Sequence, residues 1–196
     1  MMSSLHLLKR YGRENAAASA AEFALVLPVM LLFLIGIIDV GYYIWQVNRA
    51  EKAVQIGARW AVATDMVPAT LRDYSFAVSG GIPQGTVVPA GSFPTVTCTS
   101  SSCTAWGHNQ AAFDSILGRM QEIKSGIEAN NLIVEYEWSG LGYAGDPNGP
   151  DVAPIVTVRL TGMTHTPITS LIFGTLNLPT FAYSLTAEDS AGSFSN

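Results

Sequence analysis

Charged side chains are scarce in this chain. Only 13% of its 196 residues are Asp, Glu, Lys or Arg, and its mean hydropathy is +0.28. Soluble domains usually hold about 25% charged residues, so this composition disfavours a wholly soluble protein. The apolar excess lies mainly in one N-terminal block, which predicts a membrane segment joined to one soluble domain.

The charges that are present are unevenly placed. Residues 1–21 carry Lys9, Arg10 and Arg13 against a single acid, whereas residues 40–196 hold seven basic and twelve acidic side chains. A basic flank stays on the cytoplasmic side of a membrane segment, so we expect a cytoplasmic N-terminus and an exported C-terminal domain. The exported part is acidic and lacks a Lys/Arg stripe, which argues against nucleic acid as a partner.

Cysteine is equally rare, with only Cys98 and Cys103 present. In an exported domain such a pair persists as a disulfide, and the chain-entropy model gives so small a loop about 2 kcal/mol of stabilisation. A metal site would need further ligands, and His108, the nearest, stands alone. We predict a disulfide, with two free thiols as the alternative.

The uncharged, almost wholly apolar run at residues 23–38 predicts a transmembrane helix. It lies between Glu22 and Asp39, and apolar residues resume as far as Trp45. At 1.5 Å per residue the span 22–45 covers about 35 Å, more than a hydrocarbon core of about 30 Å. Tyr42, Tyr43 and Trp45 then fall where an aromatic belt is expected.

A cleaved secretory signal is the rival interpretation of the same block. Signal peptidase cuts after small residues beyond the apolar run, where this chain has Asp39 to Trp45 instead. The small residues, at 16–21, lie before the run. Ordinary signal cleavage is therefore disfavoured, and any processing is expected at the cytoplasmic face.

The helical pattern continues beyond the apolar block. A stripe of small and β-branched residues recurs there at three- and four-residue spacing: Val47, Ala50, Val54, Ala58 and Ala61. This predicts one helix over residues 18–64 whose outer third packs on a sheet. The chain then divides into a basic cytoplasmic leader (1–17), the long helix (18–64) and an exported domain (65–196).

The exported domain is predicted to be α+β. Apolar residues of helical period indicate a second helix over 110–127. Runs of β-branched and aromatic residues indicate three strands of an antiparallel sheet, at 132–138, 155–161 and 181–187.

The remaining segments give weaker signals. Residues 66–108 are rich in Gly and Pro and poorly patterned, with a short helix expected at 68–78 and a small hairpin at 95–98 and 103–106. Residues 167–173 are expected to form a further short helix whose Leu171, Ile172 and Phe173 plug the core.

No nucleophile, base and orienting group stand in a recognisable arrangement. His6, His108 and His165 are interpreted as partly exposed polar residues rather than bases. We therefore expect no enzyme, no cofactor and no small-molecule substrate.

A metal site is not predicted either. Asp146, Asn148 and Asp151 offer oxygens to calcium, but they lack the Gly and Glu that complete an EF-hand loop. The sequence Asp-Pro-Asn-Gly is ordinary turn chemistry, so the turn is the favoured interpretation.

Two acids at the edges of the apolar block are candidates for function, because a carboxylate is costly there without a partner. For Glu22 the adjacent small residues favour a functional role. For Asp39 the favoured interpretation is that it snorkels to the interface beside the aromatic belt. Pro28 lies inside the span, where it either bends the axis or leaves a segment that unwinds when subunits pack.

The chain resembles a known family in this region. The residues that carry the resemblance are the small-residue run, the sequence EFALVLP at 22–28, the sequence GIIDVG at 36–41, then Ala53 and the sequence GAR at 57–59. Over residues 13–62 they resemble the TadE-like family, minor pseudopilins of the tight-adherence (Tad) pilus machinery.

The resemblance implies a processing and assembly site. In that family a prepilin peptidase at the cytoplasmic face can cut five residues before the glutamate. Here that cut falls between Ala17 and Ala18, with Ala17 where Gly is usual, and Glu22 becomes the fifth mature residue. The new ammonium and the Glu22 carboxylate, next to Phe23, would pair between adjacent subunits and set their register.

Three functions follow from these observations. The first is a pseudopilin of the bacterial inner membrane, with a periplasmic C-terminal domain, that works with other pilins and assembly proteins. The second is an uncleaved, membrane-anchored binding module, which Ala17 in place of Gly favours. An anchored periplasmic enzyme using His165 is the least supported.

Overall fold

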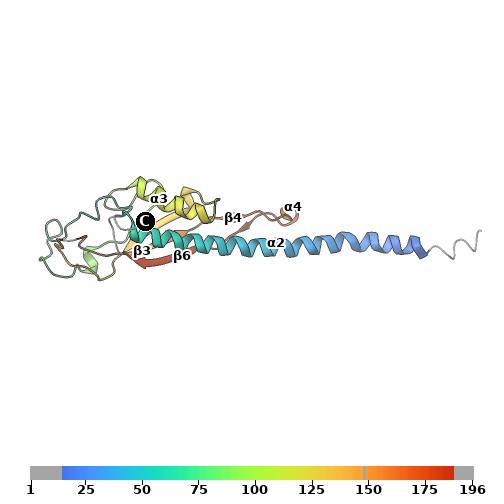
Figure 1. Cartoon of the computed structure of the whole chain (residues 1–196), viewed down its shortest axis with the longest axis horizontal. Helices are drawn as coiled ribbons and strands as arrows, with labels where there is room; N and C mark the ends of the chain where they lie inside the picture. Colours follow the sequence, from blue (N-terminus) through green and yellow to red (C-terminus); the bar gives the residue numbers. More distant parts are fainter. Residues whose placement is uncertain (1–14, 148, 188–196) are drawn as a thin grey trace, which may run out of the picture. The chain divides into compact units, whose positions relative to one another are not determined.

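The computed structural model describes residues 15–147 and 149–187, and side chains within these ranges except those of 15–17, 172 and 173. Its helices and strands are, in chain order, α2 (Asn15–Ala63), η1 (Ala90–Ser92), β1 (Val96–Cys98), α3 (Gln110–Ile123), η2 (Ala129–Asn131), β2 (Leu132–Glu137), β3 (Ile155–Leu160), β4 (Thr164–His165), α4 (Ser170–Phe173), β5 (Leu176–Asn177) and β6 (Phe181–Thr186) (Figure 1). The predicted α+β class is confirmed.

The chain divides into two compact units. The first, which we call the anchor unit, comprises Met1–Ile44 and Thr166–Thr175, and the second, the sheet unit, comprises Trp45–His165 and Leu176–Asn196. α2 runs without interruption through Pro28 and contributes to both units. Within the anchor unit it is long and apolar enough to cross a membrane, and its large apolar side chains from Phe23 to Ile44 are mostly exposed.

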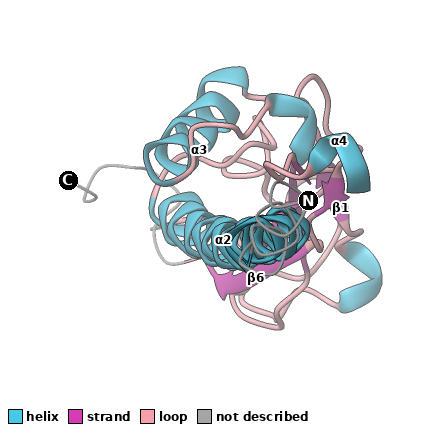
Figure 2. Cartoon of the chain, turned by 90° about the vertical axis from the view of Figure 1, so that its right-hand side faces the viewer, coloured by secondary structure: helices cyan, strands magenta, loops and turns pink. Residues whose placement is uncertain are grey.

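The sheet unit holds a four-stranded antiparallel sheet in the order β1-β2-β3-β6, whose edge strands β1 and β6 are labelled in Figure 2. The register aligns Cys98, Val134, Val158 and Tyr183 across the four strands. Three of the strands lie where the sequence predicts them. The expected hairpin forms in part: an antiparallel bridge joins Cys98 to Cys103, and the Thr104 amide donates to the Thr97 carbonyl, but residues 103–106 form no strand. β1 itself pairs with β2.

One face of the sheet carries the core. Alternate residues of β2 and β3 are buried, whereas Glu135 and Arg159 lie on the other face and form an ion pair of 2.6 Å. The outer third of α2 faces the core with its small-residue stripe, and Ala50, Ala53 and Ala58 are fully buried. Small side chains allow the helix to approach its neighbours closely, as the spacing predicts.

The helix α3 packs beside the outer third of α2 (Figure 2). Trp60 Nε1 donates a hydrogen bond of 2.7 Å to Ser115 Oγ, and Arg49 donates to the carbonyl of Ile123 at the end of α3. α3 ends at Ile123, four residues before the predicted end, because Lys124 leaves the helical conformation and reaches Gln46 on α2. These contacts join the two helices at the middle and at the C-terminal end of α3.

In the Gly- and Pro-rich segment before α3, aromatic rings pack against one another where a helix was expected. Residues 68–78 form turns, so the helix expected there is wrong. Tyr74 packs edge-on against Phe76 with ring centroids 4.8 Å apart, and Phe93 and Trp106 lie 5.2 Å apart. Burying such rings stabilises the segment without regular secondary structure.

The short helix α4 forms close to its expected position, and of the three side chains expected to plug the core only that of Leu171 is described. Leu171 is 99% exposed, and the helix belongs to the anchor unit, not to the sheet unit. The expectation that Leu171 packs in the core is therefore wrong. The cause is a tertiary contact with α2, described below.

Gly57 marks the closest approach between α2 and α3. A Cβ at this position would lie 2.7 Å from Met120 Cγ. We expect Gly57→Val to lower the free energy of unfolding by about 1–3 kcal/mol, because the core there has no room for the added methyl groups. Thermal or denaturant unfolding of the full chain in detergent measures this.

Gly118→Val is the matched control. Gly118 also lies inside a helix, but nothing lies within 4 Å of a Cβ built there, so we expect a change of less than about 0.5 kcal/mol. Equal effects of the two substitutions would contradict the close approach of α2 and α3.

Candidate functional site

The predicted processing and assembly residues lie at the start of α2. The bond between Ala17 and Ala18 is inside the helix, near its first turn, so a peptidase would have to unwind that turn to reach it. Glu22 and Phe23 follow one turn later, and both side chains are exposed. Their exposure leaves the carboxylate and the ring accessible to another protein.

Asp39 has surroundings unlike those of Glu22. Its side chain is only 6% exposed, so the interpretation that it snorkels to the interface is wrong. Oδ1 accepts a hydrogen bond of 2.7 Å from the Ile168 amide, and Oδ2 accepts bonds from the Thr169 amide and hydroxyl at 2.9 and 2.6 Å. The carboxylate thus ties residues 168–169 to α2 within the anchor unit.

One feature of the sequence is consistent with this contact. Residues 160–187 contain no Asp, Glu, Lys or Arg, and of the uncharged stretches only residues 74–113 are longer. Asp39 and Thr169 are about 130 residues apart in the sequence, so no local sequence pattern predicts their contact.

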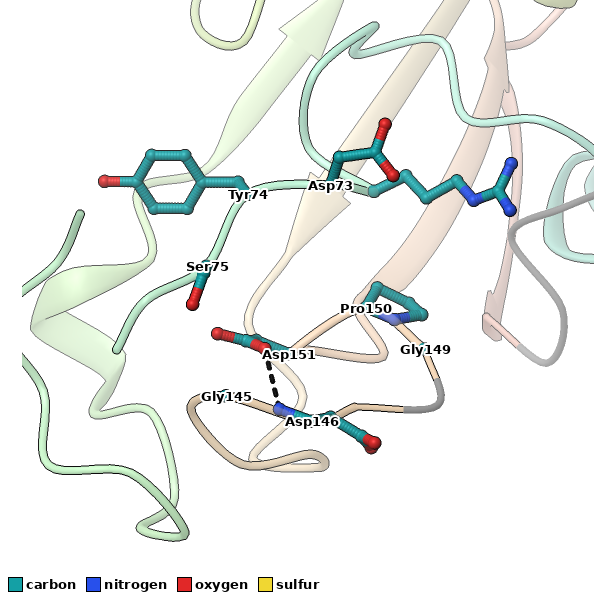
Figure 3. A pocket seen from close by; sticks show the side chains of 9 residues that line it. Asp73, Tyr74, Ser75, Gly145, Asp146, Gly149, Pro150 and Asp151 are labelled. Carbon is teal, nitrogen blue, oxygen red and sulfur yellow. Dashed lines mark hydrogen bonds between the residues drawn. The ribbon is translucent and has the colours of Figure 1, made fainter. Parts of the chain in front are cut away.

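A cleft with a volume of about 500 Å³ lies in the sheet unit (Figure 3). Nine residues line it, namely Arg72, Asp73, Tyr74, Ser75, Gly145, Asp146, Gly149, Pro150 and Asp151. Two of the three residues that were considered as calcium ligands, Asp146 and Asp151, therefore line it, and the third, Asn148, lies outside the described residues.

Asp151 is a structural residue of this cleft. It is buried, Oδ2 accepts the Phe76 amide at 2.6 Å, and Oδ1 accepts the Asp146 amide at 3.0 Å. Gly142 lies against it, since a Cβ there would come within 2.4 Å of the Asp151 carbonyl oxygen, and its φ is +98°. Asp151 thus joins the segment around Phe76 to the turn at 142–146 instead of facing an open site.

The chemistry available at the cleft is limited. Within residues 15–147 and 149–187, no three His, Cys, Asp or Glu side chains stand close enough together to hold a metal ion. The Asp146 carboxylate raises the pKa of Tyr143, which keeps that phenol neutral. The turn therefore stays the favoured interpretation of residues 146–151.

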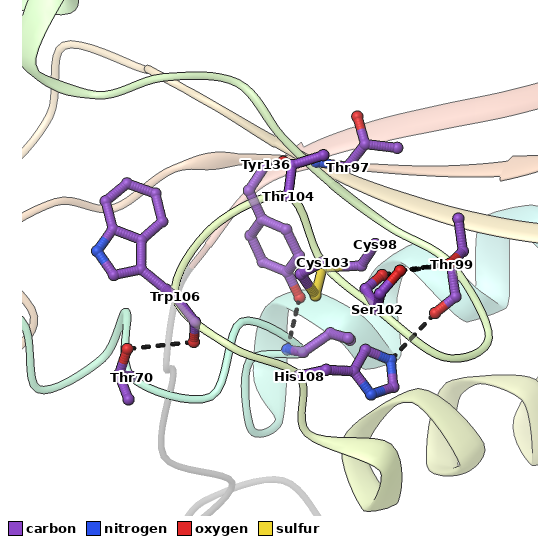
Figure 4. Close-up of a disulfide and its surroundings, with 11 residues drawn as sticks. Thr70, Thr97, Cys98, Thr99, Ser102, Cys103, Thr104, Trp106, His108 and Tyr136 are labelled. Atoms are coloured by element: carbon purple, nitrogen blue, oxygen red, sulfur yellow. Dashed lines mark hydrogen bonds between the residues drawn. A yellow bond between two sulfur atoms is a disulfide. The ribbon is translucent and has the colours of Figure 1, made fainter.

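The two cysteines are joined in a disulfide, with their Cα atoms 4.0 Å apart (Figure 4). Beside it the Val67 amide donates to the Tyr136 hydroxyl at 3.0 Å, and burial raises the pKa of Tyr136. His108 lies 3.0 Å from the Thr99 carbonyl oxygen. These groups hold the turn after β1 against the core.

The two described histidines, His108 and His165, differ in exposure. His108 is half-buried as expected, but His165 is buried in β4, so the expectation of partial exposure is wrong for it. His6 lies outside the described residues.

The basic side chains of Arg49 and Lys124 lie close together near the end of α3. Burial lowers the pKa of Lys124, and the positive charge of Arg49 lowers it further.

Asp151→Asn tests the structural role of this carboxylate. The amide would keep one acceptor oxygen and turn a donor toward the second N–H, so we expect a loss of about 1–3 kcal/mol of stability. Asp73→Asn, at the exposed edge of the same cleft, is the control and should leave the unfolding midpoint unchanged. A similar shift in both variants would indicate a general charge effect.

Comparisons with known proteins give one result for this chain. No curated protein and no solved structure matches it. A family model described as TadE-like protein matches residues 17–59, which include the predicted processing bond, Glu22, Asp39 and most of α2 but none of the strands. Through these residues the chain matches the TadE-like family, as its EFALVLP sequence predicts.

Proposed function

We propose that this protein is a pseudopilin-like structural or assembly component of a Tad pilus, with no catalytic activity of its own. The observation that carries the proposal is the match of residues 17–59 to the TadE-like family on a helix whose apolar side chains are exposed. Such a surface is stable only when lipid or other apolar helices cover it.

The proposed orientation places the N-terminus in the cytoplasm and the sheet unit in the periplasm. Lys9, Arg10 and Arg13 precede the span, which retains this end inside a bacterial inner membrane. The Cys98–Cys103 disulfide supports export, because disulfides persist in oxidising compartments such as the periplasm.

Glu22 is the proposed assembly residue. After cleavage between Ala17 and Ala18 the new ammonium of one subunit would pair with the Glu22 carboxylate of the next. Neither charge is stable alone in lipid, so pairing would fix the register between subunits. Partners of this kind are other Tad pilins or pseudopilins, and a prepilin peptidase would act first.

An uncleaved, anchored binding module is the second candidate. Ala17 stands where Gly is usual, and the cleft beside Asp146 and Asp151 offers a recessed polar surface on the sheet unit. In this case the helix is only an anchor and Glu22 has no partner subunit.

Substitution of Glu22 tests its assembly role. A charge-assisted pair contributes about 1.5–3 kcal/mol, so we expect Glu22→Ala to reduce surface pili and adhesion roughly tenfold or more. Electron microscopy of cells and an adhesion assay measure this.

Glu51→Ala is the matched control, because Glu51 is an exposed acid on the outer third of the same helix. It should leave piliation unchanged. Normal piliation in Glu22→Ala cells, with the variant present in the membrane at the usual level, would exclude the proposed pairing.

The mass of the mature chain separates the two candidates. We expect intact-protein mass spectrometry of the membrane-purified protein to give a chain that begins at Ala18. The Ala17→Gly variant should be processed at least as completely, because it restores the usual residue before the cut. A chain that begins at Met1 in both cases would favour the anchored module.

A further inference from the structure

We propose that residues 166–175, which we call the tip loop, insert into the leaflet of the membrane next to the exported domain and are held there by Asp39. The inference rests on the proposal that α2 spans the membrane. It goes beyond that proposal because it assigns a second lipid-binding segment, far along the chain.

The composition of the tip loop suits lipid. It lies within residues 160–187, which contain no Asp, Glu, Lys or Arg. Two of its apolar side chains are turned outward: Leu171 is 99% exposed and Ile168 is 66% exposed. Leaving them in water forgoes the stabilisation that burial of a large aliphatic side chain provides.

The loop is attached to α2 at membrane depth. Asp39 lies six residues before Trp45, which corresponds to about 9 Å along the helix. If the aromatic residues at 42–45 mark the interface, the bonds from Ile168 and Thr169 to Asp39 place these residues on the hydrocarbon side of it. A loop held there must either enter the lipid or displace it.

Several backbone amides of the loop have hydrogen-bond partners, which lowers the cost of placing the loop in lipid. Unsatisfied amides are costly in lipid, so irregular backbone is tolerated there only when its groups have partners. Pro167 has no N–H, the Ile168 and Thr169 amides bond to Asp39, the Ser170 amide bonds to the Pro167 carbonyl, and the Gly174 amide bonds to the Ser170 carbonyl. Asp39 thus provides acceptors for two of the loop's amides.

A shallow apolar groove continues this surface. It has a volume of about 460 Å³ and is lined by Leu32, Phe33, Gly36, Ile37, Val40 and Thr169. The groove is continuous with the exposed apolar face of α2, and all of its helix residues lie within the predicted span 22–45. We assign an acyl chain as its occupant, because the lining offers no charge and almost no polar group.

The loop is also well placed to be a tip. β4 and β5 pair antiparallel, with Thr164 opposite Asn177 and His165 opposite Leu176. The tip loop therefore connects two strands that pair with each other. Pairing of the strands at its base limits the freedom of the loop and lowers the entropic cost of inserting it.

Site-specific fluorescence in proteoliposomes tests the proposal. Leu171→Cys in the full chain is labelled with an environment-sensitive fluorophore and reconstituted in phosphatidylethanolamine and phosphatidylglycerol vesicles; the native cysteines are protected by their disulfide. We expect a blue-shifted emission and strong quenching by lipids that carry a nitroxide near the headgroup. Because Leu171 is fully exposed, its substitution should not affect folding.

Two labelled positions provide controls. Val78→Cys places the dye at an equally apolar residue that is 86% exposed in the sheet unit, where we expect water-like emission and quenching several-fold weaker than at position 171. Leu25→Cys places it on the exposed face of α2, where lipid quenching reports insertion of the helix itself.

A third variant tests the role of Asp39. Asp39→Asn combined with Leu171→Cys keeps the size of the side chain but removes one acceptor oxygen. We expect quenching at position 171 to fall toward the Val78 value while quenching at position 25 is unchanged. Unchanged quenching at 171 would overturn the assignment of Asp39 as the group that holds the loop.

The remaining outcomes are equally decisive. Water-like emission at 171 with normal quenching at 25 would overturn the loop insertion and leave the membrane helix intact. A blue-shifted but unquenched dye at 171 would assign the loop to contact with another protein. Absence of quenching at 25 as well would overturn the membrane span, and with it both proposals.

Discussion

One uninterrupted helix has to suit two different surroundings, and the rest of the structure depends on this constraint. From Phe23 to Ile44 most of the large apolar side chains of α2 are exposed, whereas from Ala50 to Ala61 one face is buried against a protein core. The change of side-chain size along the helix permits both. Large residues give an apolar surface of the kind that a membrane helix needs, and small ones allow α3 and the sheet to approach closely, as at Gly57.

In a chain with few charges, individual carboxylates organise whole segments. Asp39 binds two amides and a hydroxyl of the tip loop, and Asp151 binds two amides that are separated by about 70 residues. Each acid satisfies backbone donors that would otherwise be buried without partners. These contacts explain how Gly- and Pro-rich segments, which have little regular secondary structure, are fixed in the fold.

The two carboxylates of the apolar block differ in a way that bears on function. Asp39 is used within the chain, so it is not available to another subunit. Glu22 is exposed one turn after the predicted cut, and its position within the matched residues 17–59 makes it the acid suited to pairing between subunits. Because Asp39 is bound within the chain, Glu22 is the proposed assembly residue.

The sequence by itself determined the features that depend on local periodicity and composition. These are the long helix, the second helix, three of the strands and the TadE-like segment around Glu22. The periodicity of a helix or strand depends only on residues that are close together in the sequence. Only the tertiary structure decided which distant residues meet. The burial of Asp39, the outward position of Leu171 and the pairing of β1 with β2 all depend on contacts between segments far apart in the chain, whose free energies leave no local pattern.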